Sequence, residues 1–399
     1  MNANLYALFQ SRFPADRAAP FIEMPDGRIY RYADLDDQSA RYAALLLGLG
    51  LKPGDRVAVQ VEKSPEAVFL YAACLRAGLA YLPLNTAYPP PELDYFIGNA
   101  EPGAIVARPE HEAALAAIAR QHGVRHVLTL GAAGEGSLPA LAAATGVDPI
   151  LAHSTPGETA AILYSSGTTG RPKGAMLSHH NLASNGLALH RAWGFRPNDV
   201  LLHALPIFHA HGLFVALHTT LLNGTGMIFC PKFDPAEILR LLPKATVFMG
   251  VPTLYERLLL QPGLDRARCA HMRLFISGSA PLLESTFTRF REQTGHTILE
   301  RYGMTETGMN TSNPLDGERR GGTVGFALPG VSVRIVGADG RPVATGETGE
   351  LQVKGDTFGV LLAHAGQDGA DFHQGWLFRT GDLAAPIRTA TSPWSGAPR

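Results

Sequence analysis

The sequence has few cysteines and little charge. Its three cysteines, Cys74, Cys230 and Cys269, are an odd number with no metal-binding spacing, so we expect reduced, mostly buried thiols rather than a disulfide framework. Charged residues make up 17% of the chain and the formal net charge is −1. This balance does not favour a nucleic-acid or anionic-membrane partner.

Long uninterrupted apolar runs are also missing. The stretch Ala67–Leu82 is interrupted by Arg76 and Gly78, which excludes a membrane span there. The first residues lack the charged-then-apolar pattern of a signal peptide. Together with the reduced thiols, these absences predict a cytoplasmic enzyme.

What the sequence does have is an alternation of helical and strand patterns. Helical spacing is found over Tyr32–Leu49 and Ser64–Ala77, the second with Ser64 as N-cap, Pro65 in the first turn and Gly78 just past its end. Short apolar runs predict the strands Ala104–Ala107, His126–Leu130, Ala160–Tyr164, Val200–Ala204, Gly226–Phe229, Ala245–Met249 and Arg273–Ser277. The rhythm predicts an α/β fold with largely parallel sheets.

The pattern of apolar and polar residues changes after Gly325. Val331–Val336 and Gly349–Gly355 alternate apolar and polar residues between Gly-rich turns, which predicts a smaller antiparallel β region. Residues 384–399 are rich in Pro, Ser, Thr and Gly and have no core-forming period. We therefore expect one folded region over 1–383 and an irregular tail over 384–399.

The strongest chemical signal is the string Tyr164-Ser-Ser-Gly-Thr-Thr-Gly-Arg-Pro-Lys-Gly174. It follows a predicted strand and precedes a helical pattern near His180. Glycines bring backbone N–H groups close to an oxyanion, hydroxyls add donors and Lys173 adds a cation, so the loop can hold a polyphosphate. It is not a Walker A motif. By composition alone, such a loop is more often a flexible linker.

Three further segments follow in order. They are Ser277-Gly-Ser-Ala-Pro281, Arg301-Tyr-Gly-Met-Thr-Glu306 and Trp376-Leu-Phe-Arg-Thr-Gly-Asp382. Each alone reads as a turn or cap, but the four together resemble the motifs of the adenylate-forming superfamily. The resemblance implies the family's large N-terminal domain, with two α/β subdomains and a small β-barrel-like subdomain, and with the C-terminal lid domain absent.

The resemblance also implies roles for individual residues. Catalytic roles would belong to Lys173, Thr305, Glu306 and His209. Nucleotide contacts would come from Ser165, Ser166, Gly167, Thr168, Thr169, Gly170, Ser277, Gly278, Ser279, Ala280, Glu300, Tyr302, Gly303, Met304, Thr305 and Asp382. Glu306 and Ser166 would contact Mg²⁺, which prefers oxygen ligands. ATP, Mg²⁺ and coenzyme A would be the cofactor and cosubstrates, and a carboxylic acid the remaining partner.

Arg301 narrows the choice of acid. A guanidinium beside the acyl pocket gains nothing from an apolar chain, whereas a second carboxylate would pair with it. Most arginines simply face solvent. The neighbouring strings, Glu300–Pro314 and His203–Phe214 among them, resemble malonyl-CoA synthetases. That resemblance implies malonate as the acid, contacted by Arg301 and His209 in a cavity kept small by Ser279 and Met309.

Two stretches depart from the family pattern, at residues 356–370 and after Leu383. Synonymous codons for Gly359–Gly369 and for Arg388–Arg399 can encode family-like sequence in a neighbouring frame, so we hypothesise two reading-frame slips. The family's hinge and catalytic lysine would then be missing and thioester formation impaired. The gene's nucleotide sequence tests this.

Other functions also fit parts of this sequence pattern. A synthetase for another short acid, such as methylmalonate, shares the same motifs. A non-catalytic truncated remnant fits the departures from the family. A peptide-synthetase adenylation domain is disfavoured, because Arg301 suits a diacid better than an amino acid. Replacing Arg301 by alanine distinguishes a diacid enzyme from the others.

Overall fold

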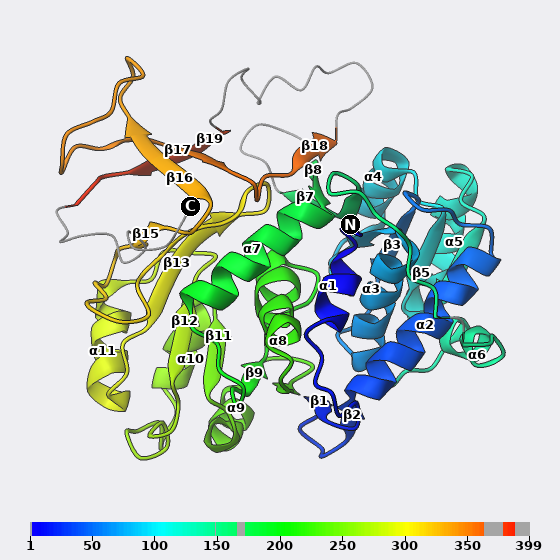
Figure 1. The fold of residues 1–399 in the computed structure, drawn as a ribbon, viewed down its shortest axis with the longest axis horizontal. Coiled ribbons are helices and arrows are strands. Elements are labelled where there is room, and N and C mark those ends of the chain that lie inside the picture. Colours follow the sequence, from blue (N-terminus) through cyan, green and yellow to red (C-terminus); the bar gives the residue numbers. More distant parts are fainter. Residues whose placement is uncertain (1, 148, 166–171, 363–377, 388–399) are drawn as a thin grey trace.

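A computed structural model describes residues 2–147, 149–165, 172–362 and 378–387. Within these ranges, two large sheets with parallel central strands lie on either side of a layer of helices, and a small antiparallel sheet lies beside one end of both (Figure 1). The predicted α/β fold with a smaller β region is confirmed. No helix in the described part of the chain is long and apolar enough to cross a membrane.

The first large sheet contains the phosphate-loop motif at one side. Its strand order is β18-β8-β7-β4-β3-β5-β6, parallel from β6 to β7 and antiparallel from β7 to β18. The strands are β3 (Arg56–Gln60), β4 (Ala80–Pro83), β5 (Ala104–Ala107), β6 (His126–Thr129), β7 (Thr159–Ser165), β8 (Lys173–Ser178) and β18 (Val360–Leu362).

The second large sheet is parallel from β1 to β13 and antiparallel at its two edges. Its order is β15-β14-β13-β12-β11-β9-β10-β1-β2. The strands are β1 (Pro20–Glu23), β2 (Ile29–Arg31), β9 (Leu201–His203), β10 (Met227–Phe229), β11 (Val247–Gly250), β12 (Leu274–Ser277), β13 (Leu299–Met304), β14 (Gly308–Ser312) and β15 (Phe326–Ala327). The small sheet pairs β16 (Val331–Val336), β17 (Gly349–Gly355) and β19 (Phe378–Ala384) in antiparallel fashion.

Helices cover both faces of each large sheet. The apolar cluster between the sheets joins residues of the middle helices to both sheets, while separate clusters lie under the outer helices. The middle layer holds α1 (Leu5–Gln10), α2 (Tyr32–Gly48), α3 (Pro65–Ala77), α7 (His179–Ala192), the π-helix His211–Leu217 and α8 (His218–Asn223).

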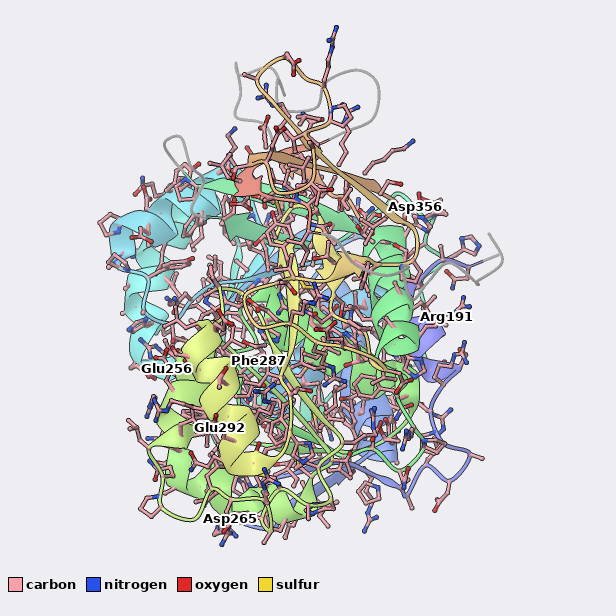
Figure 2. The ribbon with its side chains drawn as sticks, turned by 90° about the vertical axis from the view of Figure 1, so that its left-hand side faces the viewer. Arg191, Glu256, Asp265, Phe287, Glu292 and Asp356 are labelled. Carbon is pink, nitrogen blue, oxygen red and sulfur yellow. The ribbon has the colours of Figure 1, made fainter. Side chains whose placement is uncertain are left out.

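The outer layers hold the remaining helices. Against the first sheet lie α4 (Pro90–Ala100), the 3₁₀ turn Pro109–His111 and α5 (Glu112–Gln121), with α6 (Ser137–Ala143) beside α2. Against the second lie α9 (Pro235–Leu241), the 3₁₀ turn Leu242–Lys244, α10 (Pro252–Leu259) and α11 (Glu284–Thr294). Figure 2 looks onto this side, where α11 carries buried Phe287 and exposed Glu292.

The helix α3 shows how local sequence determines an element. The hydroxyl of Ser64 accepts a hydrogen bond from Ala67 N at 3.2 Å, and Gly78 ends the helix in the left-handed region at φ 70°. Glycine adopts this left-handed conformation without a steric penalty because it has no Cβ atom. Both ends agree with the sequence-based prediction, and the helix is buried along nearly all its length.

Candidate active site

A cavity of about 1120 Å³ lies where the three sheets meet. Its wall is formed by the β7–β8 hairpin, the β13–β14 hairpin, the segment leading into the π-helix, and β19. Ten of the residues predicted as site residues line it: Ser165, Lys173, His209, Ser279, Arg301, Gly303, Met304, Thr305, Glu306 and Met309. The structure therefore gathers motifs that lie far apart in sequence around one space.

The phosphate-loop motif connects two antiparallel strands. Ser165 ends β7 and stands opposite Lys173, the first residue of β8, so the two flanks of the loop are paired. Both residues line the cavity. The predicted residues Ser166, Gly167, Thr168, Thr169 and Gly170 lie outside the described residues. What the structure places is the hairpin that presents the loop and its lysine.

Thr305 and Glu306 lie in the turn between β13 and β14. The pairing of these strands shifts at Tyr302 and Gly303, and a Cβ at Gly303 would lie 2.4 Å from Gly308 O. Only glycine tolerates that approach. The side chain of Asn185 on α7 holds β14 by donating to Met309 O at 3.0 Å and accepting from Met309 N at 3.2 Å.

The segment 356–362 connects this turn to the phosphate-loop hairpin. Thr357 Oγ1 donates to Thr307 O at 2.7 Å, and Gly359 N donates to Glu306 O at 2.9 Å. The next residues form β18, in which Leu362 pairs with Gly174 of β8. The segment thereby links the backbone at Glu306 to the strand that begins at Lys173.

The start of the same segment is attached to α7. Asp356 O accepts hydrogen bonds from Asn181 Nδ2 at 2.9 Å and from Ser184 Oγ at 3.2 Å. Figure 2 shows Asp356 near the first turn of this helix and Arg191 towards its other end. The sequence departs from the family pattern in this segment, yet its described part forms ordered contacts; residues 363–377 and 388–399, which contain the rest of both departures, lie outside the described residues.

A hydrogen bond between Tyr302 and Asp382 connects the second large sheet to the small sheet. The phenol of Tyr302 donates to the Asp382 carboxylate, and burial together with this hydrogen bond raises the pKa of Tyr302. Neither residue lines the cavity itself, but Gly303, Thr380 and Gly381 beside them do. The aromatic ring of Tyr302 and the exposed carboxylate of Asp382, both predicted to contact the nucleotide, therefore lie together beside the cavity.

Arg301, the residue before Tyr302 on β13, lines the cavity itself. It is 2% exposed, and its Nε and Nη2 atoms have no hydrogen-bond partner in the described part of the chain. Burial lowers the pKa of Arg301 to about 9. Its guanidinium fits because residue 278 is glycine: a Cβ at Gly278 would lie 2.6 Å from Arg301 Cζ. A buried, unpaired guanidinium is costly unless an anion compensates it.

His211 lies next to this guanidinium and was not identified from the sequence. Its Nδ1 is 3.3 Å from Ser279 Oγ, its buried Nε2 has no partner among the described residues, and it lines the cavity. Burial, and then the charge of Arg301, lowers the pKa of His211 far below its usual value. Ser279 itself has φ 69°, unusual for a residue other than glycine. His209, the predicted histidine, is exposed and also lines the cavity.

Four further predicted residues are not part of the cavity lining. Ser277 and Gly278 are buried and Ala280 is exposed, but none of them lines the cavity. Glu300 is 3% exposed and accepts a hydrogen bond from Leu282 N at 2.9 Å, while burial raises its pKa. In this structure Glu300 holds the loop after β12.

The cavity suits a magnesium–nucleotide better than a metal held by protein alone. No cluster of three or more His, Cys, Asp or Glu side chains that could hold a metal is present among the described residues. Glu306 contributes one carboxylate to the cavity wall. Mg²⁺ is characteristically bound by one or two carboxylates plus substrate phosphates, so the residues present fit that ion.

Residues 9–361 match the AMP-binding enzyme family. The chain belongs to this family. The mitochondrial malonate–CoA ligase ACSF3 of Mus musculus is 34% identical over 89% of this chain and 67% of its own length. The Xenopus laevis malonate–CoA ligase ACSF3 is 34% identical over 84% of this chain, which spans only 61% of that protein.

Solved structures of the family agree. The ATP-bound crystal structure of MatB from Rhodopseudomonas palustris is 50% identical, covers 97% of this chain and 77% of its own, and superposes with a TM-score of 0.93. The inhibitor-bound N-terminal domain of FACL13 from Mycobacterium tuberculosis is 25% identical and has a TM-score of 0.86, with 96% of this chain and 97% of that domain covered. The described fold thus corresponds to the N-terminal domain of these family members.

Proposed function

We propose that this chain provides the nucleotide- and acid-binding domain of a malonate–CoA ligase, which forms malonyl-CoA, AMP and pyrophosphate from malonate, ATP and coenzyme A. The observation that carries the choice of acid is Arg301, buried in the cavity wall with two nitrogens that have no partner among the described residues. The malonate–CoA ligases named above support the proposal.

The proposed reaction has two steps. A malonate carboxylate oxygen attacks the α-phosphorus of ATP and pyrophosphate leaves; the coenzyme A thiol then attacks the acyl carbon and AMP leaves. Lys173 and the phosphate loop would bind the β- and γ-phosphates, while Tyr302 and Asp382 would bind the adenine and ribose. Mg²⁺, bound with Glu306 and with the predicted ligand Ser166, would neutralise phosphate charge.

The second carboxylate of malonate would remain unreacted against Arg301. A bidentate guanidinium–carboxylate pair would satisfy both unpartnered nitrogens, and the neighbouring His211 and Ser279 offer further polar atoms. Holding this end fixed directs the first carboxylate towards the phosphate side of the cavity. Such positioning is a large part of catalysis in phosphoryl transfer.

The test is ATP–pyrophosphate exchange with malonate, methylmalonate, acetate and propionate, and calorimetric titration of malonate in the presence of Mg²⁺ and α,β-methylene-ATP. We expect malonate to bind the wild-type chain. Arg301→Ala should weaken this binding at least about 30-fold, because removing one partner of a buried charge pair costs roughly 2 kcal/mol or more. ATP affinity should be unchanged.

Arg191→Ala is the control, since Arg191 is exposed on α7 outside the cavity. Equal use of acetate and malonate, or malonate binding that survives the loss of Arg301, would refute the choice of acid. The cytoplasmic location also stays a prediction, and the ACSF3 relatives are mitochondrial proteins.

A further inference from the structure

Lys63 is buried in the cavity wall, and no acidic partner of it lies in the part of the chain that the structure describes. It follows β3, is 8% exposed and lines the cavity, and no ion pair to it is found in the described ranges. Its Nζ lies 3.0 Å from His203 Nδ1 and donates to His203 O at 2.9 Å. It also lies 4.2 Å from the centre of the Phe229 ring. Burying an amine away from water is unfavourable unless other contacts compensate it. The two contacts with His203 are therefore the place to look for the role of Lys63.

The chemistry of the neighbours determines the tautomer of His203. Its Nε2 lies 3.0 Å from Gly212 O, and a carbonyl oxygen can only accept. Nε2 therefore carries the proton and Nδ1 presents a lone pair, to which Lys63 Nζ donates. Burial and the charge of Lys63 hold the pKa of His203 well below its usual value, so the ring stays neutral. Lys63, His203 and Gly212 form a continuous chain of contacts from the segment after β3, through β9, to the π-helix.

The far end of this link is the first turn of the π-helix. Gly212 follows His211 and lies so close to the chain before it that a Cβ would be 2.0 Å from Pro206 O. A single-turn π-helix is a departure from regular α-helix that is common at functional sites. The hydrogen bond from His203 holds the carbonyl of Gly212, and thereby the backbone that carries His211.

We infer that Lys63 is a positioning residue for the acid-binding wall, the part of the cavity formed by Arg301, His211 and Ser279. Through His203 and Gly212, Lys63 holds His211 beside the other two residues. The inference rests on the proposed function, because the wall matters only if the acid binds there. The proposed effect of Lys63 passes through His203. Loss of either residue should therefore have the same consequence.

Malonate and MgATP binding distinguish this role from simple structural support. Lys63→Met keeps the length of the side chain but removes the donors. We expect it to weaken malonate binding about tenfold while MgATP affinity stays within about twofold. Lys52→Met, at an exposed lysine outside the cavity, is the matched control and should bind both ligands as the wild type does.

A double-mutant comparison tests whether the effect passes through His203. His203→Phe should weaken malonate binding to a similar extent, and adding Lys63→Met to it should cause no further loss. His203→Gln, whose amide can still donate to Gly212 O, should bind more tightly than His203→Phe. Additive losses from the two single changes would overturn the inference, as would equal weakening of malonate and MgATP binding.

Crystal structures of the wild-type chain and of Lys63→Met provide a readout that does not depend on malonate. The inference expects the contact between residue 203 and Gly212 to lengthen and the His211 ring to move away from Ser279. An unchanged His211 in the variant would overturn it. If the wild-type and Lys52→Met chains both fail to bind malonate, the proposed function fails, and the crystal structures alone then decide whether Lys63 positions His211.

Discussion

At the scale of single residues, the acid-binding wall depends on close approaches that leave little freedom for substitution. Arg301 is buried because Gly278 has no side chain, and His211 is held between Ser279 and the backbone of the π-helix. From the sequence, Arg301 could be singled out because it stands beside a known motif. His211 could not, because two histidines two residues apart give no sign of which one faces the guanidinium.

Gly278→Ala tests the first of these approaches. The new Cβ would lie 2.6 Å from Arg301 Cζ, whereas carbon atoms in contact need about 3.5–4.0 Å. We expect the guanidinium to be displaced and malonate binding to weaken at least about fivefold, with MgATP binding little changed. Calorimetry measures both. Gly157→Ala is the control, since a Cβ there meets nothing within 4 Å; equal behaviour of the two variants would contradict the prediction.

Lys63 also predicts a pH dependence of stability. Burial lowers its pKa to about 7 in the folded protein, against about 10.4 when unfolded. Between these values the unfolded chain binds more protons, so the free energy of unfolding rises with pH, by up to about 1.4 kcal/mol per pH unit. His203 and Cys230 remain in Lys63→Met. Burial is the larger cause for both groups: it holds the pKa of His203 well below its usual value and raises the pKa of Cys230 to about 11, so in the folded chain neither titrates between pH 6.5 and pH 9.

Urea unfolding of the wild type and Lys63→Met at pH 6.5 and pH 9 checks this. The wild type should gain free energy of unfolding relative to the variant as the pH rises. Below pH 7 both folded and unfolded wild-type chains carry the charge, so the difference should be flat there. A difference that is the same at both pH values would show that Lys63 keeps an ordinary pKa.

At the scale of elements, many strands and the two helices α2 and α3 could be predicted from pattern alone. β5 has the predicted bounds, and α2 and α3 differ by one residue at one end. The π-helix was missed, because nothing in the apolar run His211–Leu217 separates it from an α-helix. The link from 356–362 to β8 and Glu306 was missed as well, since strand partners distant in sequence leave no local signal.

Thr357→Val tests that link. The change removes the donor to Thr307 O while keeping the shape of the side chain. Leaving a buried carbonyl without its partner costs about 1–3 kcal/mol, and we expect the turn with Glu306 to loosen. MgATP binding should weaken and require more Mg²⁺, measured by calorimetry over a Mg²⁺ series.

The conservative change Thr357→Ser keeps the donor and should restore MgATP binding. This separates positioning of Glu306 from a general loss of stability. A Thr357→Val variant that unfolds more easily but binds MgATP as the wild type does would limit the segment to a structural role.

At the scale of the whole molecule, each sheet contributes a different part of the cavity. The first sheet presents Lys173, the second presents Arg301 and Glu306, and the small sheet carries Asp382 opposite Tyr302. Sequence order alone could predict that these motifs belong to one site, through the family resemblance. The sequence could not predict which hydrogen bonds fix the positions of these motifs. Those bonds join residues far apart in the chain, such as Lys63 and His203 or Thr307 and Thr357.

Because three sheets contribute to one cavity, the order in which they are synthesised determines when the cavity can form. During synthesis at the ribosome, the proposed nucleotide contacts emerge in order, from Ser165 on β7 to Asp382 on β19. At ordinary translation rates roughly 10 to 40 seconds separate these two events. The two large sheets can pack in that interval, but the proposed ATP contacts are all in place only after β19 has paired with β17, so ATP binding would report that the small sheet has formed.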